Sequence, residues 1–320
     1  MGGDIDKILV TGASGQIGSE LTPRLREVYG KDAVVASDLR RPSFDEGPFE
    51  LLDVTDAKKL EDIVVEQGID TIVHLAALLS ASGEQRPNVA WNVNVGGLYN
   101  VLEVARARKL RRVFNPSSIA VFGPETPREM TPQDTVMRPK TMYGITKVTG
   151  ELLGNYYYHK YGVDVRGARF PGIISNVAPP GGGTTDYAVE IFYEAIKRGS
   201  YSCFLRPDST LPMMYMPDCL KGVVQMLDAD LSTLQHHADF NMGSLSFSPK
   251  ELVAEIRKHL PGLEVEYKPD YRQAIADSWP KSIDDSAARR EWGWGPEFDL
   301  AAMVKDMLKV LGERHRRGKL

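Results

Sequence analysis

Short apolar runs alternate with amphipathic stretches along the first half of the chain. The apolar runs predict strands at 8–10, 33–37, 49–54, 70–75, 111–115 and 163–170. Apolar residues that recur every three or four positions predict helices at 17–28, 57–67, 89–109 and 141–161. Strands that alternate with helices are typical of a parallel sheet with helices on both faces. We therefore expect an α/β, doubly wound fold that binds ligands at the carboxyl ends of its strands.

The pattern changes after residue 171. Residues 172–185 are rich in glycine and proline, which indicates a crossing between domains, and 211–217 is predicted to be a loop. Further helices are expected at 187–198, 218–227, 249–259 and 300–311, and further strands at 240–243 and 264–267. We therefore expect a first domain over 1–174, to which about 212–235 return, and a smaller α/β substrate lobe over most of 175–320.

A glycine-rich loop follows the first strand. Gly12, Gly15 and Gly18 stand in the order Gly-x-x-Gly-x-x-Gly, between an apolar strand and a helix. Gly12 allows a tight turn, Gly15 lets a pyrophosphate approach the backbone, and Gly18 lets the helix pack closely on the strand. Free N–H groups at the start of the helix favour an anion. The loop predicts the dinucleotide site of a Rossmann domain, with a plain strand–turn–helix as the alternative.

The second strand leads to Asp38, about 20 residues beyond the last glycine. A carboxylate here accepts the hydroxyls of the adenosine ribose and repels a 2′-phosphate, so NAD is favoured over NADP. Arg40 and Arg41 lie close by and keep NADP as the alternative. Asp53, at the end of the third strand, is expected near the adenine. The small residues that follow the fourth strand, Ala76 and Ala77, let the backbone approach the cofactor.

The composition argues against several other partners. The 320-residue chain has a formal net charge of −4 and a pI of about 5.9, so neither nucleic acid nor an anionic membrane is expected to bind. Cys203 and Cys219 are too few for a zinc cluster or a disulfide framework, and no metal site is predicted. No leader peptide or membrane-spanning run is recognised, so a cytoplasmic protein is expected.

One helix and one strand end carry the residues suited to acid–base chemistry. Tyr143 and Lys147 are four residues apart and share a helical face. The ordinary phenol pKa of about 10 must fall by about two to three units for Tyr143 to act as a base at neutral pH. The Lys147 cation and a positive nicotinamide favour the phenolate. Ser118, at a neighbouring strand end, can hold the same substrate oxygen. Alone, such a pair is more often a surface feature, but with the glycine loop and Asp38 it indicates one site.

These motifs resemble a known superfamily. The loop 12–18, Asp38, the segment 75–77, Ser118, and Tyr143 with Lys147 resemble the extended short-chain dehydrogenases/reductases, which include the nucleotide-sugar epimerases. In the second half, 183–192, 211–218 and 278–293 resemble the short-chain type of L-threonine 3-dehydrogenase. The resemblance covers nearly the whole chain.

The resemblance implies a reaction and its residues. The reaction is the oxidation of L-threonine by NAD to 2-amino-3-oxobutyrate, without a metal, in threonine catabolism. Tyr143 would take the hydroxyl proton, with Lys147 and Ser118 as catalytic partners. The residues expected at the cofactor are Gly12, Ser14, Gly15, Gln16, Ile17, Gly18, Asp38, Asp53, Val54, Leu75, Ala76, Ala77, Tyr143, Lys147 and Phe170. Those expected at the substrate are Ser80, Ser117, Ser118, Tyr143, Thr184, Thr185, Asp186 and Trp279.

Several substrate residues have an alternative role. Asp186 is suited to hold the substrate ammonium, and equally to cap the helix that follows it. Trp279 can close over the substrate or pack within the lobe. Ser117 and Ser118 are both placed to contact the substrate oxygen, and Ser118 is preferred by analogy with the epimerases.

Two other functions fit the same fold. A nucleotide-sugar epimerase or dehydratase needs several basic groups for its diphosphate, but 171–216 offers only Lys197, Arg198 and Arg206 as cations. A regulator that only senses NAD does not need a tyrosine, a lysine and a serine together. Oxidation of L-threonine is therefore the preferred interpretation.

A homodimer is expected from the same resemblance. The superfamily pairs two long helices of each subunit in a four-helix interface, which here correspond to 89–109 and 141–161. The run Tyr156, Tyr157 and Tyr158 directs an aromatic ring outward as well as inward, which fits an interface. Plain surface tyrosines are the alternative.

Overall fold

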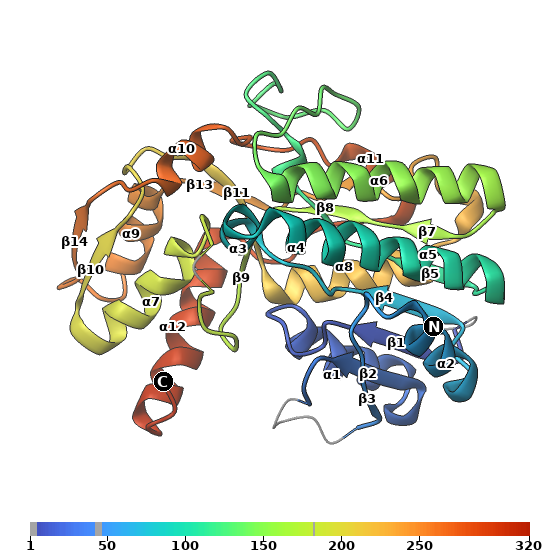
Figure 1. Ribbon diagram of the computed structural model, residues 1–320. Coiled ribbons are helices and arrows are strands. Elements are labelled where there is room, and N and C mark those ends of the chain that lie inside the picture. The colour runs from blue at the N-terminus through green and yellow to red at the C-terminus, as the bar shows by residue number, and fades with distance from the viewer. Residues whose placement is uncertain (1–4, 42–46, 182) are drawn as a thin grey trace.

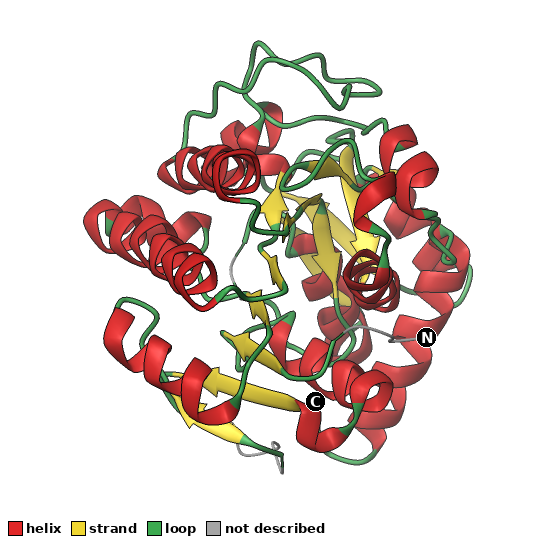
Figure 2. Ribbon diagram, turned by 90° about the vertical axis from the view of Figure 1, so that its right-hand side faces the viewer, coloured by secondary structure: helices red, strands yellow, loops and turns green. Residues whose placement is uncertain are grey.

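The centre of the fold is a six-stranded parallel sheet in the order β3-β2-β1-β4-β5-β7 (Figure 1, Figure 2). The structure is a computed structural model that describes residues 5–41, 47–181 and 183–320. The strands are β1 (Ile8–Thr11), β2 (Val34–Asp38), β3 (Phe49–Leu51), β4 (Thr71–His74), β5 (Arg112–Phe114) and β7 (Val165–Arg166). The predicted α/β, doubly wound fold is confirmed.

Alternate residues of β1 face opposite helical layers, because successive side chains of a strand point to opposite faces. Ile8 and Val10 pack in the core that contains α1 (Gly18–Tyr29) and α8 (Met216–Asp228). Leu9 packs on the other face, in the core that contains α2 (Ala57–Gln67). Both faces of the sheet are thereby buried, which explains why the strands read as uninterrupted apolar runs.

Two long helical segments lie side by side over that second face (Figure 1). One consists of α4 (Pro87–Trp91), a π-helical stretch over 92–96 and α5 (Gly97–Arg108), in direct succession. The other is α6 (Met142–Tyr161), which carries Tyr143 and Lys147. The Thr141 hydroxyl caps α6 by accepting the Gly144 N–H at 3.1 Å.

The second half of the chain forms a lobe to the left in Figure 1. Its helices α7 (Tyr187–Arg198), α9 (Pro249–Arg257) and α12 (Leu300–Arg316) pack against one another. The lobe and its approaches contain β9 (Gly172–Ile174), α7 (Tyr187–Arg198), β10 (Ser200–Cys203), β11 (Leu211–Tyr215), β13 (Leu245–Phe247), α9 (Pro249–Arg257), β14 (Glu264–Tyr267), α10 (Arg272–Asp277) and α12 (Leu300–Arg316). The remaining elements are α3 (Ser80–Gln85), β6 (Ser117–Ser118), β8 (Ala168–Phe170), β12 (Phe240–Asn241), α11 (Ser286–Trp292) and short 3₁₀ turns at 31–33, 119–121 and 231–233.

Three expected segments differ most from the structure. The strand expected over 163–170 breaks at Gly167, where a Cβ atom would lie 2.4 Å from the Asn115 carbonyl oxygen. After the break, β8 leaves the large sheet and pairs with β6 and β12. The loop expected at 211–217 is instead the buried strand β11, which runs directly into α8. β11 pairs with β9, so the segment 172–185, which was expected to cross between domains as a loop, begins with a strand. The division at residue 174 stays a prediction.

Candidate active site

The glycine loop is packed tightly against the end of β4. Gly12 has a φ of +70°, and a Cβ atom there would lie 2.6 Å from the Ala76 nitrogen. A Cβ atom at Gly18 would lie 2.3 Å from the Gly12 carbonyl oxygen. Only glycine fits at these two positions, so the start of α1 lies directly beside two strand ends. This arrangement fits the pyrophosphate of a dinucleotide, which binds to backbone N–H groups at such a helix start.

Asp38 lies at the carboxyl end of β2 and contacts the same loop. Its carboxylate accepts the Ser14 N–H at 2.9 Å and the Leu39 N–H at 2.7 Å. The Arg41 guanidinium donates to the Gly47 carbonyl at 2.9 Å and lies 5.2 Å from the centre of the Phe49 ring. The loop is therefore bordered by an acceptor at the place where the ribose of the cofactor is expected.

A cavity of about 240 Å³ begins at the glycine loop and reaches the second lobe. Most of the residues predicted for the site line it, namely Gly12, Gly15, Gln16, Ile17, Gly18, Leu75, Ala77, Ser80, Ser117, Ser118, Tyr143, Lys147, Phe170, Thr184, Thr185, Asp186 and Trp279. The predicted residues outside its described lining are Ser14, Asp38, Asp53, Val54 and Ala76. Asp53 accepts the Thr55 N–H at 2.9 Å. The sequence did not predict lining residues such as Pro171 and Ile173, because an apolar residue beside a strand end does not by its type indicate a binding site.

The Tyr143 phenol, the Ser118 hydroxyl and the Lys147 ammonium lie together on one wall of this cavity. Ser118 lies beside the phenol and lowers its pKa, and its hydroxyl accepts the Ala120 N–H at 3.2 Å. Lys147 Nζ donates to the Pro116 carbonyl at 2.7 Å and lies 5.5 Å from the centre of the Tyr143 ring. The predicted base, oxygen contact and cation therefore come together, from α6 and from the end of β6.

The protein around these groups disfavours their charged forms. Burial raises the pKa of Tyr143 to about 12, and the hydrogen bond with Ser118 partly offsets that rise. Burial lowers the pKa of Lys147 to about 8, opposed by the carboxylate of Glu151. The sequence predicts a lowered phenol pKa. In the chain alone burial raises the Tyr143 pKa, so the direction is the opposite of the predicted one.

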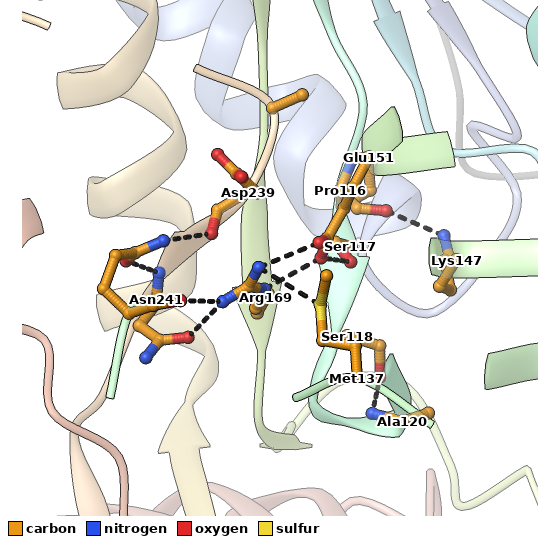
Figure 3. A network of polar contacts seen from close by, with 12 residues as sticks. Pro116, Ser117, Ser118, Ala120, Met137, Lys147, Glu151, Arg169, Asp239 and Asn241 are labelled. Carbon is orange, nitrogen blue, oxygen red and sulfur yellow. Dashed lines mark hydrogen bonds and ion pairs between the residues drawn. The ribbon is translucent and has the colours of Figure 1, made fainter. Parts of the chain in front are cut away.

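Two supporting residues carried no signal in the sequence. Asn94, in the π-helical stretch, accepts the Leu78 N–H at 2.7 Å and donates to the Leu78 carbonyl at 3.0 Å. It also donates to Thr146 on α6 at 3.1 Å. Glu151 bonds Ser117 and Arg169 behind the cavity (Figure 3). Their burial and their partners become visible only in the structure.

The far end of the cavity is formed by the lobe. Asp186 precedes α7, but its side chain does not cap that helix. Its Oδ2 instead accepts the Gly181 N–H at 2.6 Å and the Gly183 N–H at 2.9 Å, so the capping alternative is wrong. Trp279 both lines the cavity and belongs to the apolar core of the lobe, which joins the two roles considered for it. Its carbonyl accepts a hydrogen bond from Arg128 at 3.1 Å.

Other polar groups near the site are structural. His74 is buried in β4 and shares a 2.9 Å hydrogen bond with the Thr11 hydroxyl, as expected of a core histidine. Among the described residues, no group of three or more histidine, cysteine, aspartate or glutamate side chains is placed to hold a metal ion. Within the same residues, no helix combines the length and apolar character needed to cross a bilayer.

Comparison with known proteins agrees with this geometry. The family described as "NAD dependent epimerase/dehydratase family" matches residues 8–243. The chain belongs to this family. NAD is its cofactor, as Asp38 and the glycine loop predict, and the expected superfamily is confirmed.

Its relatives include solved L-threonine dehydrogenases. One, from Phytophthora infestans, is 54% identical with a TM-score of 0.94, and the match covers 98% of this chain and 100% of that one. A monomeric L-threonine 3-dehydrogenase from a metagenome, in its apo form, is 49% identical with a TM-score of 0.93, over 96% of this chain and 99% of that one. An uncharacterized epimerase/dehydratase of Staphylococcus haemolyticus is 49% identical over 98% of this chain and 99% of its own length. The chain is an enzyme, and its predicted similarity to the L-threonine dehydrogenases is confirmed.

Proposed function

We propose that this enzyme oxidises the 3-hydroxyl of L-threonine with NAD and produces 2-amino-3-oxobutyrate. One observation carries the proposal: a single cavity holds the Tyr143, Ser118 and Lys147 side chains on one wall and Asp186 at its far end. The first three are suited to a secondary alcohol, and the carboxylate is suited to an ammonium group. The identity of 54% to a solved L-threonine dehydrogenase supports the same reaction.

In this mechanism Tyr143 accepts the proton of the substrate hydroxyl as its carbon becomes a carbonyl. Bound NAD supplies the acceptor for the hydride that leaves the same carbon. Ser118 donates to the substrate oxygen and fixes its position beside the phenol. Lys147 supplies a positive charge that favours the phenolate. Because burial raises the Tyr143 pKa to about 12, this charge and that of the nicotinamide are needed for proton transfer at neutral pH.

The substrate ammonium is assigned to Asp186. Both backbone hydrogen bonds to this carboxylate reach Oδ2, so Oδ1 is the oxygen that we assign to the ammonium. Thr184 and Thr185 line the cavity beside it and provide hydroxyl donors for the substrate carboxylate. Trp279 closes the same end and excludes water from the reacting atoms.

A nucleotide-sugar epimerase or dehydratase is the second candidate, favoured by the name of the staphylococcal relative. Such a substrate needs cations for its diphosphate. Arg198 pairs with Glu194, Arg206 pairs with Asp277, and Lys197 lies over the Tyr193 ring. None of these three cations belongs to the described lining of the cavity. The amino acid is therefore the better substrate.

The homodimer is part of the same proposal. Large apolar side chains lie exposed on the outer faces of α4, α5 and α6: Trp91 at 45%, Tyr99 at 48%, Leu152 at 61% and Tyr156 at 50%. A patch of this kind is typical of a protein interface. Tyr157 is buried, so only part of the tyrosine run is available to a partner. The cytoplasmic location and the role in threonine catabolism stay predictions.

The test is the appearance of NADH absorbance when the protein is mixed with NAD and L-threonine. NADP and L-allo-threonine serve as controls for cofactor and stereochemistry. We expect a rise with NAD and L-threonine and a much slower one in both controls. Lack of turnover with L-threonine, together with tight binding of a uridine diphosphate sugar, would favour the epimerase.

A further inference from the structure

A buried ion pair lies behind the active-site wall. Glu151 and Arg169 are 1% and 2% exposed. The guanidinium donates to both carboxylate oxygens, each at 2.9 Å, from Nε to Oε1 and from Nη2 to Oε2 (Figure 3). Neither residue belongs to the described lining of the cavity, so neither is among the proposed substrate or cofactor contacts. Burying two charges has a large desolvation cost, which calls for a role beyond filling space.

The pair is anchored on both sides of the glutamate. Arg169 also donates to the Gln133 carbonyl at 2.8 Å and to the Asn241 side chain at 3.1 Å, which holds its guanidinium in place. On the other side, the Ser117 hydroxyl donates to Glu151 Oε1. The carboxylate thus joins the strand end of β6 to strand β8 through α6.

This contact completes a regular pattern between α6 and the strand end. The consecutive residues 116–118 all face side chains of α6: the Pro116 carbonyl accepts from Lys147, the Ser117 hydroxyl donates to Glu151, and Ser118 lies beside the Tyr143 phenol. Because consecutive Cα atoms are about 3.8 Å apart, a shift of one residue along this segment would move Ser118 away from the phenol. The middle contact, between Ser117 and Glu151, is therefore placed to hold the register of the outer two.

Glu151 also lies one helical turn beyond Lys147, on the same face of α6. Around the ammonium lie Tyr143 on the preceding turn, His74 on β4, and Arg169 of β8 behind the glutamate. The His74 pKa is lowered to about 3 by burial, so this ring is neutral at physiological pH. Glu151 is the anion that acts on Lys147 and opposes the effect of burial on it.

We propose that Glu151 is a positioning residue: it fixes the strand end that carries Ser118 against the turn that carries Tyr143, and it places a carboxylate one helical turn from Lys147. The rate measurement below rests on the proposed function. The labelling experiment described next does not rest on it, because it follows the protonation of Lys147 directly.

The first experiment follows competitive acetylation of Lys147 against pH, read by mass spectrometry of its peptide. Glu151→Gln keeps the shape of the side chain and removes its charge. We expect the labelling midpoint to fall by about one pH unit in this variant, because the nearby anion is lost. Glu151→Asp retains the charge and restores the midpoint to within a few tenths of the parent value. The matched control is Asp164→Asn, which removes the carboxylate from the buried ion pairs that Asp164 forms with Arg112 and Arg166. We expect this variant to leave the labelling midpoint of Lys147 unchanged.

The second experiment measures steady-state kinetics of Ser117→Ala, which leaves the ion pair intact and is expected to fold even where Glu151→Gln does not. We expect kcat to fall about tenfold with the KM for L-threonine unchanged, because Ser118 loses its fixed position. A folded Glu151→Gln variant with the parent midpoint, or a Ser117→Ala variant with the parent kcat, would overturn the proposal. A raised KM with normal kcat would make Ser117 a substrate contact and also overturn it. If the parent does not oxidise L-threonine, the proposed function fails while the labelling result stands.

Discussion

The Lys147 ammonium lies 5.5 Å from the centre of the Tyr143 ring, one turn along α6, and donates to the Pro116 carbonyl rather than to the phenol. In the proposed mechanism Lys147 therefore acts on the phenol as a charge through space. A charge at this distance still favours the phenolate, and the Ser118 side chain lies directly beside the phenol. This division of roles leads to separate predictions for the base, the cation and the cofactor site.

Tyr143→Phe is expected to lower kcat by several orders of magnitude. The loss exceeds the 10²–10⁴ typical of acid–base catalysis, since the phenol also orients the substrate. NAD binding, followed by quenching of tryptophan fluorescence, is expected to stay within about threefold of the parent, because the glycine loop and Asp38 are unchanged. A variant that retains most of its turnover would assign the base to another group.

As the pH increases, kcat/KM is expected to rise from pH 6 and to stop rising near pH 8. The rise follows the proton-accepting phenol, and the limit follows Lys147, whose pKa is lowered to about 8 and whose charge is lost above it. Lys147→Arg stays charged throughout this range. The kcat/KM of this variant is therefore expected to be lower than that of the parent but to keep rising beyond pH 9. If kcat/KM stops rising at the same pH in the parent and in Lys147→Arg, the limit does not arise from the Lys147 ammonium.

Asp38→Asn is expected to shift preference from NAD toward NADP. The amide oxygen still accepts the Ser14 N–H that the carboxylate accepts at 2.9 Å, but the negative charge that repels a 2′-phosphate is gone. The ratio of kcat/KM for the two cofactors is expected to change by about 10- to 100-fold. Asp53→Asn, at a neighbouring strand end, is the control and leaves the ratio unchanged. An unaltered ratio in Asp38→Asn would place the selectivity elsewhere.

The pH dependence of stability is expected to carry a contribution from His74. Burial lowers the pKa of the folded side chain to about 3, below its ordinary 6.5, so the unfolded chain binds one more proton between these values. The contribution is present above pH 6.5 and is lost as the pH falls toward 3. Between pH 7 and pH 5 it removes about 2 kcal/mol, as 1.36 kcal/mol for each pH unit below 6.5.

Urea unfolding at both pH values checks this contribution. His74→Gln loses the Thr11 contact and is less stable at pH 7, yet its stability is expected to fall less between pH 7 and pH 5 than that of the parent. Equal losses in the two proteins would show that the ring is already charged in the fold or that other groups dominate.

Leu152→Glu is expected to disrupt the proposed dimer. This side chain is 61% exposed on α6, and a carboxylate in an apolar interface is strongly unfavourable. Sedimentation at micromolar concentration is expected to show a dimer for the parent and a monomer for the variant. Val65→Glu, at a side chain 55% exposed on α2, is the control that leaves the dimer intact. A monomeric parent would agree with the monomeric metagenomic relative and refute the dimer.

Local patterns in the sequence determined the sheet class, the glycine loop and the shared face of Tyr143 and Lys147. These features depend on residues close together in the chain, where strand alternation, helix periodicity and glycine sterics act directly. For the same reason the bounds of α7 and β14 agree with the predicted 187–198 and 264–267.

Only the tertiary structure decided how these parts combine. It placed Ser118 beside Tyr143, put Gly167 where carbonyl oxygens leave no room for a side chain, and directed Asp186 to the backbone of its own loop. It also paired Glu151 with Arg169 and Ser117. Each depends on segments that meet only after the chain has folded. A local pattern shows which face a residue occupies, whereas packing determines what lies opposite it.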